Sequence, residues 1–363
     1  MPWSTKFSRN STSTPRRGAI LVATLGLIIL MTFLVIEFLT LSTAEVKRLS
    51  LRADQDELRT YAYSSLDITR AVLAELNEVD KKLRTPAQGW GNPLAYAEDI
   101  TFPEDIKSVI IVEDETGKVP LNINTDPKLL NAFFEKLGLD SGQANTLTDS
   151  LLDWIDPDDN ARLNGAESSY YDRKTPSYKP TGQPITDFSE LLYIQGFDEY
   201  FFDDEGKTDE RFELLKENAT LVAEGPINVN TAPPLVLELL GDEYGLDATT
   251  LKEKRKQFAE GNATLKDVLI TSNKDLDLPK QKTPAKLPYG FESKTFKITI
   301  ETSHGDNRFQ LTSLIGAVPQ QKQQKPSTPT PQGQTGKTPT PPKTSTKNQN
   351  FTILRLVENA PLN

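Results

Sequence analysis

The sequence contains no cysteine and a single histidine, His304, among its 363 residues. Without cysteine, a disulfide framework, a thiolate metal site and a cysteine nucleophile are all excluded. One histidine excludes a His-based catalytic triad and a multi-histidine metal centre, and we expect His304 to be a solvated residue in a turn between two strands. These absences argue against an enzyme and leave clustered carboxylates as the main candidates for a binding site.

Acidic residues are missing from the first seventeen positions, which carry Lys6, Arg9, Arg16 and Arg17. The whole chain has a formal net charge of −10, and residues 91–270 alone sum to about −20. So acidic a stretch disfavours phosphate binding and permits cation binding. The length is sufficient for two folded units with additional segments.

Charged residues are absent from residues 19–36, AILVATLGLIILMTFLVI, and the apolar character continues past Glu37 to Leu41. As a helix that rises about 1.5 Å per residue, this segment is about as long as a bilayer core is thick. Basic residues precede it and acids follow it, which places the amino terminus in the cytoplasm and the bulk of the chain outside. We interpret Glu37 as an interfacial, solvated acid.

The helix continues beyond the apolar segment, because no proline occurs between Arg16 and Thr85. Past Glu45, apolar residues recur at three- and four-residue steps, which predicts an amphipathic continuation. These residues are Leu58, Ala62, Leu66, Val72, Leu73, Leu76 and Val79. A secretory signal cleaved at LSTAEV, near Ala44, is the alternative, but its apolar region is usually only about 7–15 residues long. The pattern therefore favours retention of the segment.

After the long helix, strand patterns occur in two regions, one near residue 110 and one near the carboxy terminus. SVIIVEDETGKVPLNIN predicts a hairpin over residues 107–124 with its turn at 114–117. Pro120 confines the second strand of this hairpin to a sheet edge. Further strands are predicted to begin at Phe296, Arg308 and Phe351.

Helical patterns dominate between these strands, from residue 126 to about 272, and predict an inserted helical subdomain. Thr231 and Asp187 carry start signals for two of its helices. Two similar joints, PLNINTDPKLL and PINVNTAPPLVL, each run from extended chain into a helix and suggest a weak internal repeat. The predicted helices cover 127–137, 143–155, 187–194, 233–240, 248–259 and 263–270.

Residues 319–350 contain no apolar aliphatic or aromatic residue and no acid. Such a segment has nothing to bury and is predicted to be disordered. The strand-like FTILRLVE follows it, so we interpret the segment as an excursion between two adjacent strands. Closing a loop of this length costs a sheet little, because the entropy grows only logarithmically with length.

The densest acidic cluster is DWIDPDDNARLNGAESSYYD, residues 153–172. Calcium takes about six to eight oxygen ligands and tolerates irregular loops. Carboxylates this close repel one another without a cation, although the spacing does not fit an EF-hand. A solvated loop whose acids bond to their own backbone is the alternative. The acids of the loop are Asp156, Asp158, Asp159, Glu167 and Asp172.

The amino terminus resembles type IV prepilins, in which basic residues, a glycine and a long apolar helix follow one another. RRGAILVATLGL is similar to a prepilin-peptidase site, and the resemblance implies cleavage after Gly18 and methylation of the new amino terminus at Ala19. Most members carry glutamate at the fifth mature position, where this chain has Ala23. That departure is typical of the K-type minor pseudopilins of type II secretion, also called general secretion pathway protein K.

The resemblance implies an α+β, pilin-like fold: a long helix that is first transmembrane and then amphipathic, a small antiparallel sheet, and an inserted all-helical subdomain similar to SAM or helix-hairpin-helix modules. The DW-hydrophobic-D-x-D stretch followed by GAE also matches the family, some of whose members bind calcium here. It makes Asp156, Asp158 and Glu167 the first choices as ligands of a structural calcium ion, with Asp159 and Asp172 as helpers. The expected segments are 1–18 leader, 19–41 transmembrane, 42–84 amphipathic, 107–124 hairpin, 125–285 helical subdomain, 290–318 strands, 319–350 disordered insertion and 351–358 last strand.

The function implied is that of a non-enzymatic tip subunit, anchored once in the bacterial inner membrane with its bulk in the periplasm, that starts or caps the secretion pseudopilus. The implied partners are I- and J-type minor pseudopilins, prepilin peptidase and secreted proteins. A subunit without a neighbour ahead of it has no terminal amine to pair, which suits Ala23.

A DNA-binding pilin-like protein of a competence or type IV pilus system is the alternative. SELLYIQGF and INVNTAPPLVLELL resemble helix-hairpin-helix modules, which bind phosphates. The neighbouring DEYFFDDEG carries the wrong charge for DNA. We therefore expect no nucleic-acid partner and interpret these helices as a packing unit.

Overall fold

The structure is a computed structural model that describes residues 16–97, 102–122, 125–203, 205–276, 287–317 and 351–359. The chain forms two units, Met1–Glu57 and Leu58–Asn363. The predicted disordered segment and the first fifteen residues of the predicted leader lie outside the described residues.

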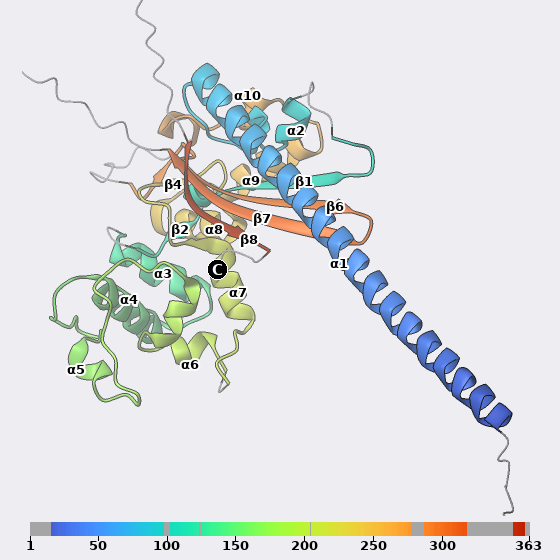
Figure 1. The fold of residues 1–363 in the computed structure, drawn as a ribbon. Helices are drawn as coiled ribbons and strands as arrows, with labels where there is room; N and C mark the ends of the chain where they lie inside the picture. The colour runs from blue at the N-terminus through green and yellow to red at the C-terminus, as the bar shows by residue number, and fades with distance from the viewer. Residues whose placement is uncertain are drawn as a thin grey trace, which may run out of the picture. The chain divides into compact units, whose positions relative to one another are not determined.

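The first unit contains the amino-terminal part of helix α1 (Arg16–Asp80), shown in blue in Figure 1. Within it, Ile20–Lys47 is long and apolar enough to cross a membrane, and none of its most apolar stretch is buried. The hydroxyls of Thr24, Thr32 and Thr40 donate to carbonyls three or four residues earlier, at 2.9, 2.7 and 2.8 Å. These bonds leave the threonine donors satisfied inside the helix, which suits an apolar environment.

The second unit contains a four-stranded antiparallel sheet with the order β1-β6-β7-β8, visible in Figure 1. Alternation along β6 places Phe296, Ile298 and Ile300 on one face, where all three are fully buried. Because β1 pairs with β6, the first strand of the sheet is joined to the carboxy-terminal strands although the helical insertion separates them in sequence. The strands are β1 (Lys107–Asp114), β6 (Thr295–His304), β7 (Asn307–Ala317) and β8 (Phe351–Glu358).

The carboxy-terminal part of α1 packs against this sheet, as the amphipathic pattern predicted. Its buried stripe belongs to the same core as the sheet residues, whereas Val79, predicted in the stripe, is exposed. Glu358 at the end of β8 accepts hydrogen bonds from Arg59 Nε at 2.8 Å and from Tyr63 OH at 2.7 Å. The last strand is thereby tied to the helix. The stripe consists of Leu58, Ala62, Leu66, Val72, Leu73 and Leu76.

The predicted hairpin over residues 107–124 is wrong. β1 pairs with β6, and this register sets Ile110 opposite Ile300 and Val112 opposite Ile298. After a 3-10 turn, η2 (Glu115–Gly117), the chain enters β2 (Val119–Pro120), which pairs in parallel with β3 (Ala219–Thr220). The eight-residue pairing with β6, which includes two apolar pairs, is more favourable than a short return strand that contains proline, because proline has no N–H to donate.

The insertion between β1 and β6 is helical, as predicted, and has its own core around Phe133, Phe134, Phe197 and Leu237. The prediction missed α7, whose sequence ERFELLKEN is mostly charged. The helices are α3 (Pro127–Lys136), α4 (Ser141–Ile155), α5 (Ser168–Tyr171), α6 (Phe197–Phe201), α7 (Glu210–Asn218), α8 (Pro234–Tyr244), α9 (Ala248–Ala259) and α10 (Leu265–Val268), with 3-10 turns η3 (Phe188–Tyr193) and η4 (Asn273–Leu276). The turns η1 (Pro86–Gln88) and α2 (Pro93–Tyr96) connect α1 to β1.

The two similar joints lie at two short parallel strand pairs, which the sequence did not predict. One is β2–β3 and the other is β4 (Ile227–Asn228) with β5 (Tyr289–Gly290), and the joints lead into α3 and α8. Asp187 is confirmed as an N-cap, since its side chain accepts from Ser189 N at 2.9 Å. Thr231 is not one, because Pro233 occupies the cap of α8 and Thr231 Oγ1 donates to Asp114.

Candidate metal centre

The acidic loop lies between α4 and α5, and aromatic packing fixes both of its ends. Asp156 is the C-cap of α4 and Glu167 is the N-cap residue of α5. Trp154, near the end of α4, packs edge-on against Tyr171 of α5, with 5.2 Å between ring centroids. Gly165 lies so close to the end of α4 that a Cβ there would be 2.0 Å from Asp153 Oδ2. The loop therefore requires glycine at this position.

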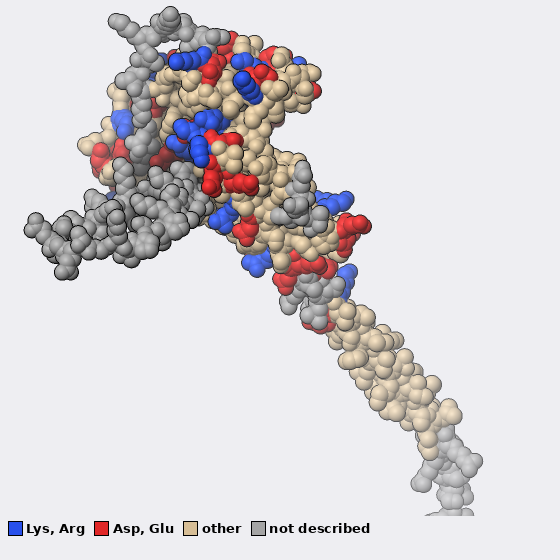
Figure 2. Space-filling view, turned by 90° about the horizontal axis from the view of Figure 1, so that it is seen from above, with Lys and Arg blue, Asp and Glu red and all other residues tan. Residues whose placement is uncertain are grey.

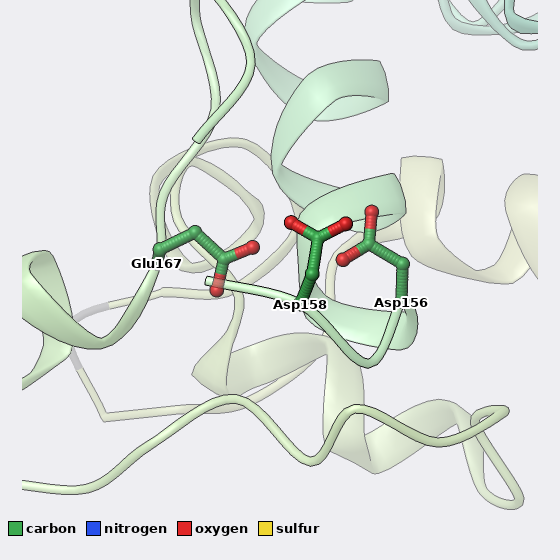
Figure 3. Close-up of side chains that lie close together, drawn as sticks. All are labelled: Asp156, Asp158 and Glu167. Carbon is green, nitrogen blue, oxygen red and sulfur yellow. The ribbon is translucent and has the colours of Figure 1, made fainter. Parts of the chain in front are cut away.

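Figure 3 shows that Asp156, Asp158 and Glu167 lie close together. One carboxylate oxygen from each lies within 4.8 Å of the other two. Oxygens that bind one calcium ion at about 2.4 Å are at most about 4.8 Å apart, so these three can share a cation. The structure thus brings together the three residues that the family resemblance made the first choices.

Two oxygens of this cluster are buried and have no hydrogen-bond partner within the described residues, namely Asp156 Oδ1 and Glu167 Oε1. Burial, followed by the charges of Asp153, Asp156, Asp159 and Asp158, raises the pKa of Glu167 to about 7. A buried carboxylate oxygen without a donor is unfavourable, and a hard cation would satisfy both atoms. The donor set therefore fits calcium, and solvent would have to supply the remaining ligands.

An arginine takes part of the negative charge. Arg162 Nη1 forms ion pairs with Asp153 and with Asp156 Oδ2, the latter at 2.7 Å. Asp153 is fully buried, and burial raises the pKa of its carboxyl against the opposing effect of Arg162. Arg162 thus offsets the charges of Asp153 and Asp156 through Asp153 Oδ1 and Asp156 Oδ2. It leaves Asp156 Oδ1 without a hydrogen-bond partner among the described residues. The sequence analysis assigned no role to either Asp153 or Arg162.

The other oxygens of the loop form local hydrogen bonds. Asp158 Oδ1 accepts from Asn160 N at 2.9 Å and Nδ2 at 2.8 Å, and these bonds lower the pKa of Asp158. Asp159 Oδ1 accepts from Ser168 N at 3.1 Å. Asp172 is exposed at the end of α5 and lies outside the three-residue cluster. Asp159 is positioned to orient the loop, whereas the structure gives no reason to assign Asp172 as a ligand.

The remaining predicted site residues are at the amino terminus. Gly18 and Ala19 both lie in α1, and nothing in the structure tests cleavage or methylation there, so processing at this position stays a prediction. His304 ends β6, and its Nε2 lies 3.4 Å from Asp105 Oδ2, with the His304 side chain partly exposed and the Asp105 side chain mostly exposed. His304 is therefore the last residue of β6 and is partly exposed, next to the turn in which it was predicted to lie.

Part of the helical insertion matches a known protein family. Residues 119–204 match the family described as type II secretion system (T2SS), protein K. The chain is 31% identical over 205 residues to type II secretion system protein K of Klebsiella pneumoniae, covering 56% of this chain and 59% of that one. It is 26% identical over 194 residues to the protein K of Pectobacterium carotovorum subsp. carotovorum, covering 52% and 55%. The chain thus spans little more than half the length of these relatives.

The fold also matches a solved structure. A chain of the GspK-GspI-GspJ complex from the type 2 secretion system of enterotoxigenic Escherichia coli superposes with a TM-score of 0.57. The match covers 86% of this chain and 100% of the other, at 17% identity. Similarity at this level concerns the fold alone.

Proposed function

This chain belongs to the type II secretion system protein K family, and we propose that it is a non-enzymatic minor pseudopilin at the tip of a secretion pseudopilus. The observation that carries the proposal is a pilin-like helix and sheet interrupted by a helical insertion, part of which matches the protein K family. The insertion joins β1 to β6, so it is a built-in part of the subunit.

Two features support the position at the tip. The insertion adds a second folded core to the pilin-like core, and this bulk is difficult to repeat along a helical fibre. Ala23 lies in α1 where most pilin-like chains carry glutamate, so this subunit lacks the acid that pairs with a neighbouring amino terminus. A subunit of this kind starts or caps the fibre and supports export across the outer membrane.

The proposed partners are an I-type and a J-type minor pseudopilin, because the structurally similar chain was solved in a complex of GspK, GspI and GspJ. We test this by purifying the full chain in detergent after co-expression with its candidate partners. Co-elution of three different chains is expected. A protein that elutes alone, with the partners forming a complex without it, would contradict the proposal.

The proposal places the chain in the inner membrane with Ile20–Lys47 as its single span and the second unit in the periplasm. Prepilin peptidase would cleave after Gly18, and the mature chain would begin with methylated Ala19. Basic residues before the span and acids after it support this orientation. The anchor then serves as the part of the helix through which the subunit enters the fibre.

We also propose that Asp156, Asp158 and Glu167 hold a structural calcium ion, with Asp159 orienting the loop. The bound ion would neutralise the cluster and rigidify the connection between α4 and α5. Calcium should raise the melting temperature of the full chain in detergent, and Asp156→Ala should abolish that rise. Equal melting of the wild type with calcium and with chelator would remove the calcium assignment.

A further inference from the structure

A separate cavity of about 430 Å³ lies where the α1–β1 connection meets η2 and the helices α8 and α9. This volume is typical of sites for small ligands or single side chains. Its wall is apolar on several sides and includes Pro86, Trp90, Pro233, Arg255 and Phe258. None of these residues belongs to the acidic loop or to the predicted processing site.

Arg255 on α9 brings a positive charge to this wall. Its Nη1 donates to Ala232 O at 2.6 Å and its Nη2 donates to Val229 O. Both acceptors are main-chain carbonyls, and no carboxylate of the described chain forms an ion pair with this guanidinium. Burial lowers the pKa of Arg255 to about 10, which still leaves the side chain charged at neutral pH. The carbonyls hold the group in place but do not neutralise it.

Trp90, another residue of this wall, carries a buried donor without a partner among the described residues. Its side chain is fully buried and packs edge-on against Phe296, with 5.2 Å between ring centroids. The indole Nε1 has no hydrogen-bond acceptor among the residues that the structure places. Buried donors normally have a partner, so both the charge and the N–H indicate a missing acceptor group.

The acids on the wall limit which acceptor can enter. Asp114 Oδ2 accepts from Asn228, Thr231 and Ser293, and its Oδ1 accepts from the main chain. Glu113 lies 3.6 Å from Lys297 Nζ, and Glu217 is exposed. These carboxylates oppose an anion of high charge, such as phosphate, more strongly than they oppose a single carboxylate.

We propose that this cavity binds one carboxylate group, held by Arg255 with Trp90 as the second donor. The planar guanidinium matches a carboxylate in charge and shape. The proline rings and Phe258 would contact the aliphatic stem of the ligand. This chemistry is shared by an acidic residue of a polypeptide and by a free dicarboxylate, and the inference does not depend on the position of the subunit in a fibre.

The test is calorimetric titration of the full chain in detergent with three probes: glutarate, a capped Gly-Glu-Gly peptide and its glutamine analogue. Arg255→Lys keeps the charge but loses the planar fork, and should weaken binding about tenfold. Trp90→Phe keeps an aromatic ring but loses the indole N–H, and should weaken binding about fivefold. Arg211→Lys, an exposed matched control, should leave binding unchanged.

Tighter binding of the glutamate peptide than of glutarate would support the site and assign a polypeptide ligand, whereas equal binding would support it and assign a free carboxylate. The proposal is overturned if no probe binds, if the glutamine peptide binds as well as the glutamate peptide, or if folded Arg255→Lys and Trp90→Phe both bind like the wild type. If Arg255→Lys fails to fold, as its melting curve would show, Trp90→Phe decides alone.

Discussion

The substitution Glu167→Gln tests the electrostatics of the acidic loop without a bound cation. Burial and the neighbouring aspartates raise the pKa of Glu167 from 4.5 to about 7. This elevation corresponds to roughly 3 kcal/mol between the ionised and the protonated carboxyl in the folded state. The residue is only 4% exposed, so solvent screens little of this cost.

The direction in which stability changes with pH follows from proton binding. The folded protein holds the Glu167 proton more tightly than the unfolded chain does, so in chelator it loses stability as the pH rises from 4.5 to about 7. Glutamine resembles the protonated carboxyl and cannot ionise. At about pH 8 in chelator, Glu167→Gln should therefore be more stable than the wild type by about 1–3 kcal/mol. At acidic pH the two proteins should be nearly equal.

The assay is urea unfolding of the full chain in detergent, followed by circular dichroism at several pH values. Glu224→Gln, at an exposed glutamate, is the matched control and should have little effect. With calcium the order should reverse, because only the wild type gains stability from the ion. A variant less stable than the wild type in chelator at about pH 8, or one with the same calcium response, would refute the reasoning.

Three further predictions concern the loop, the anchor and the core. Gly165→Ala would place a Cβ 2.0 Å from Asp153 Oδ2 and should cost about 1–3 kcal/mol in urea unfolding; an unchanged midpoint would contradict the described packing. Mass spectrometry of the membrane-extracted chain should find methylated Ala19 first, whereas a product that begins near residue 45 would indicate a cleaved signal. Leu66→Ala, at a 1% exposed position between α1 and the sheet, should cost about 2–5 kcal/mol. Val79→Ala, at a 66% exposed position of the same helix, should cost far less, and equal losses would argue against the packing.

The sequence predicted those helices and strands whose periodicity can be read from neighbouring residues. The apolar run and the stripe from Leu58 to Leu76 predicted α1 and its buried face, because helical periodicity is encoded within a few residues. The strands β6 and β8 were predicted in the same way, because the alternation of a strand is also encoded within a few residues. Residues 156, 158 and 167 were found through the family resemblance, and no local pattern alone separated them from a solvated loop.

Pairing between distant segments was not predictable from these patterns. The sequence around Asp114 allowed a local hairpin, but the strand that competes for β1 lies beyond the entire insertion. The buried hydrogen bonds of Asp114 to Asn228, Thr231 and Ser293 also join segments far apart in sequence. Arg162 was overlooked because no local pattern showed that it forms ion pairs with Asp153 and Asp156.

The most direct test of the account is the location of this chain in assembled pseudopili. Fibres carrying an affinity label on this subunit and a second label on the repeating subunit can be imaged by electron microscopy. The account predicts the first label at one end of each fibre and the second along its length. This chain at regular intervals along the shaft would contradict a tip subunit.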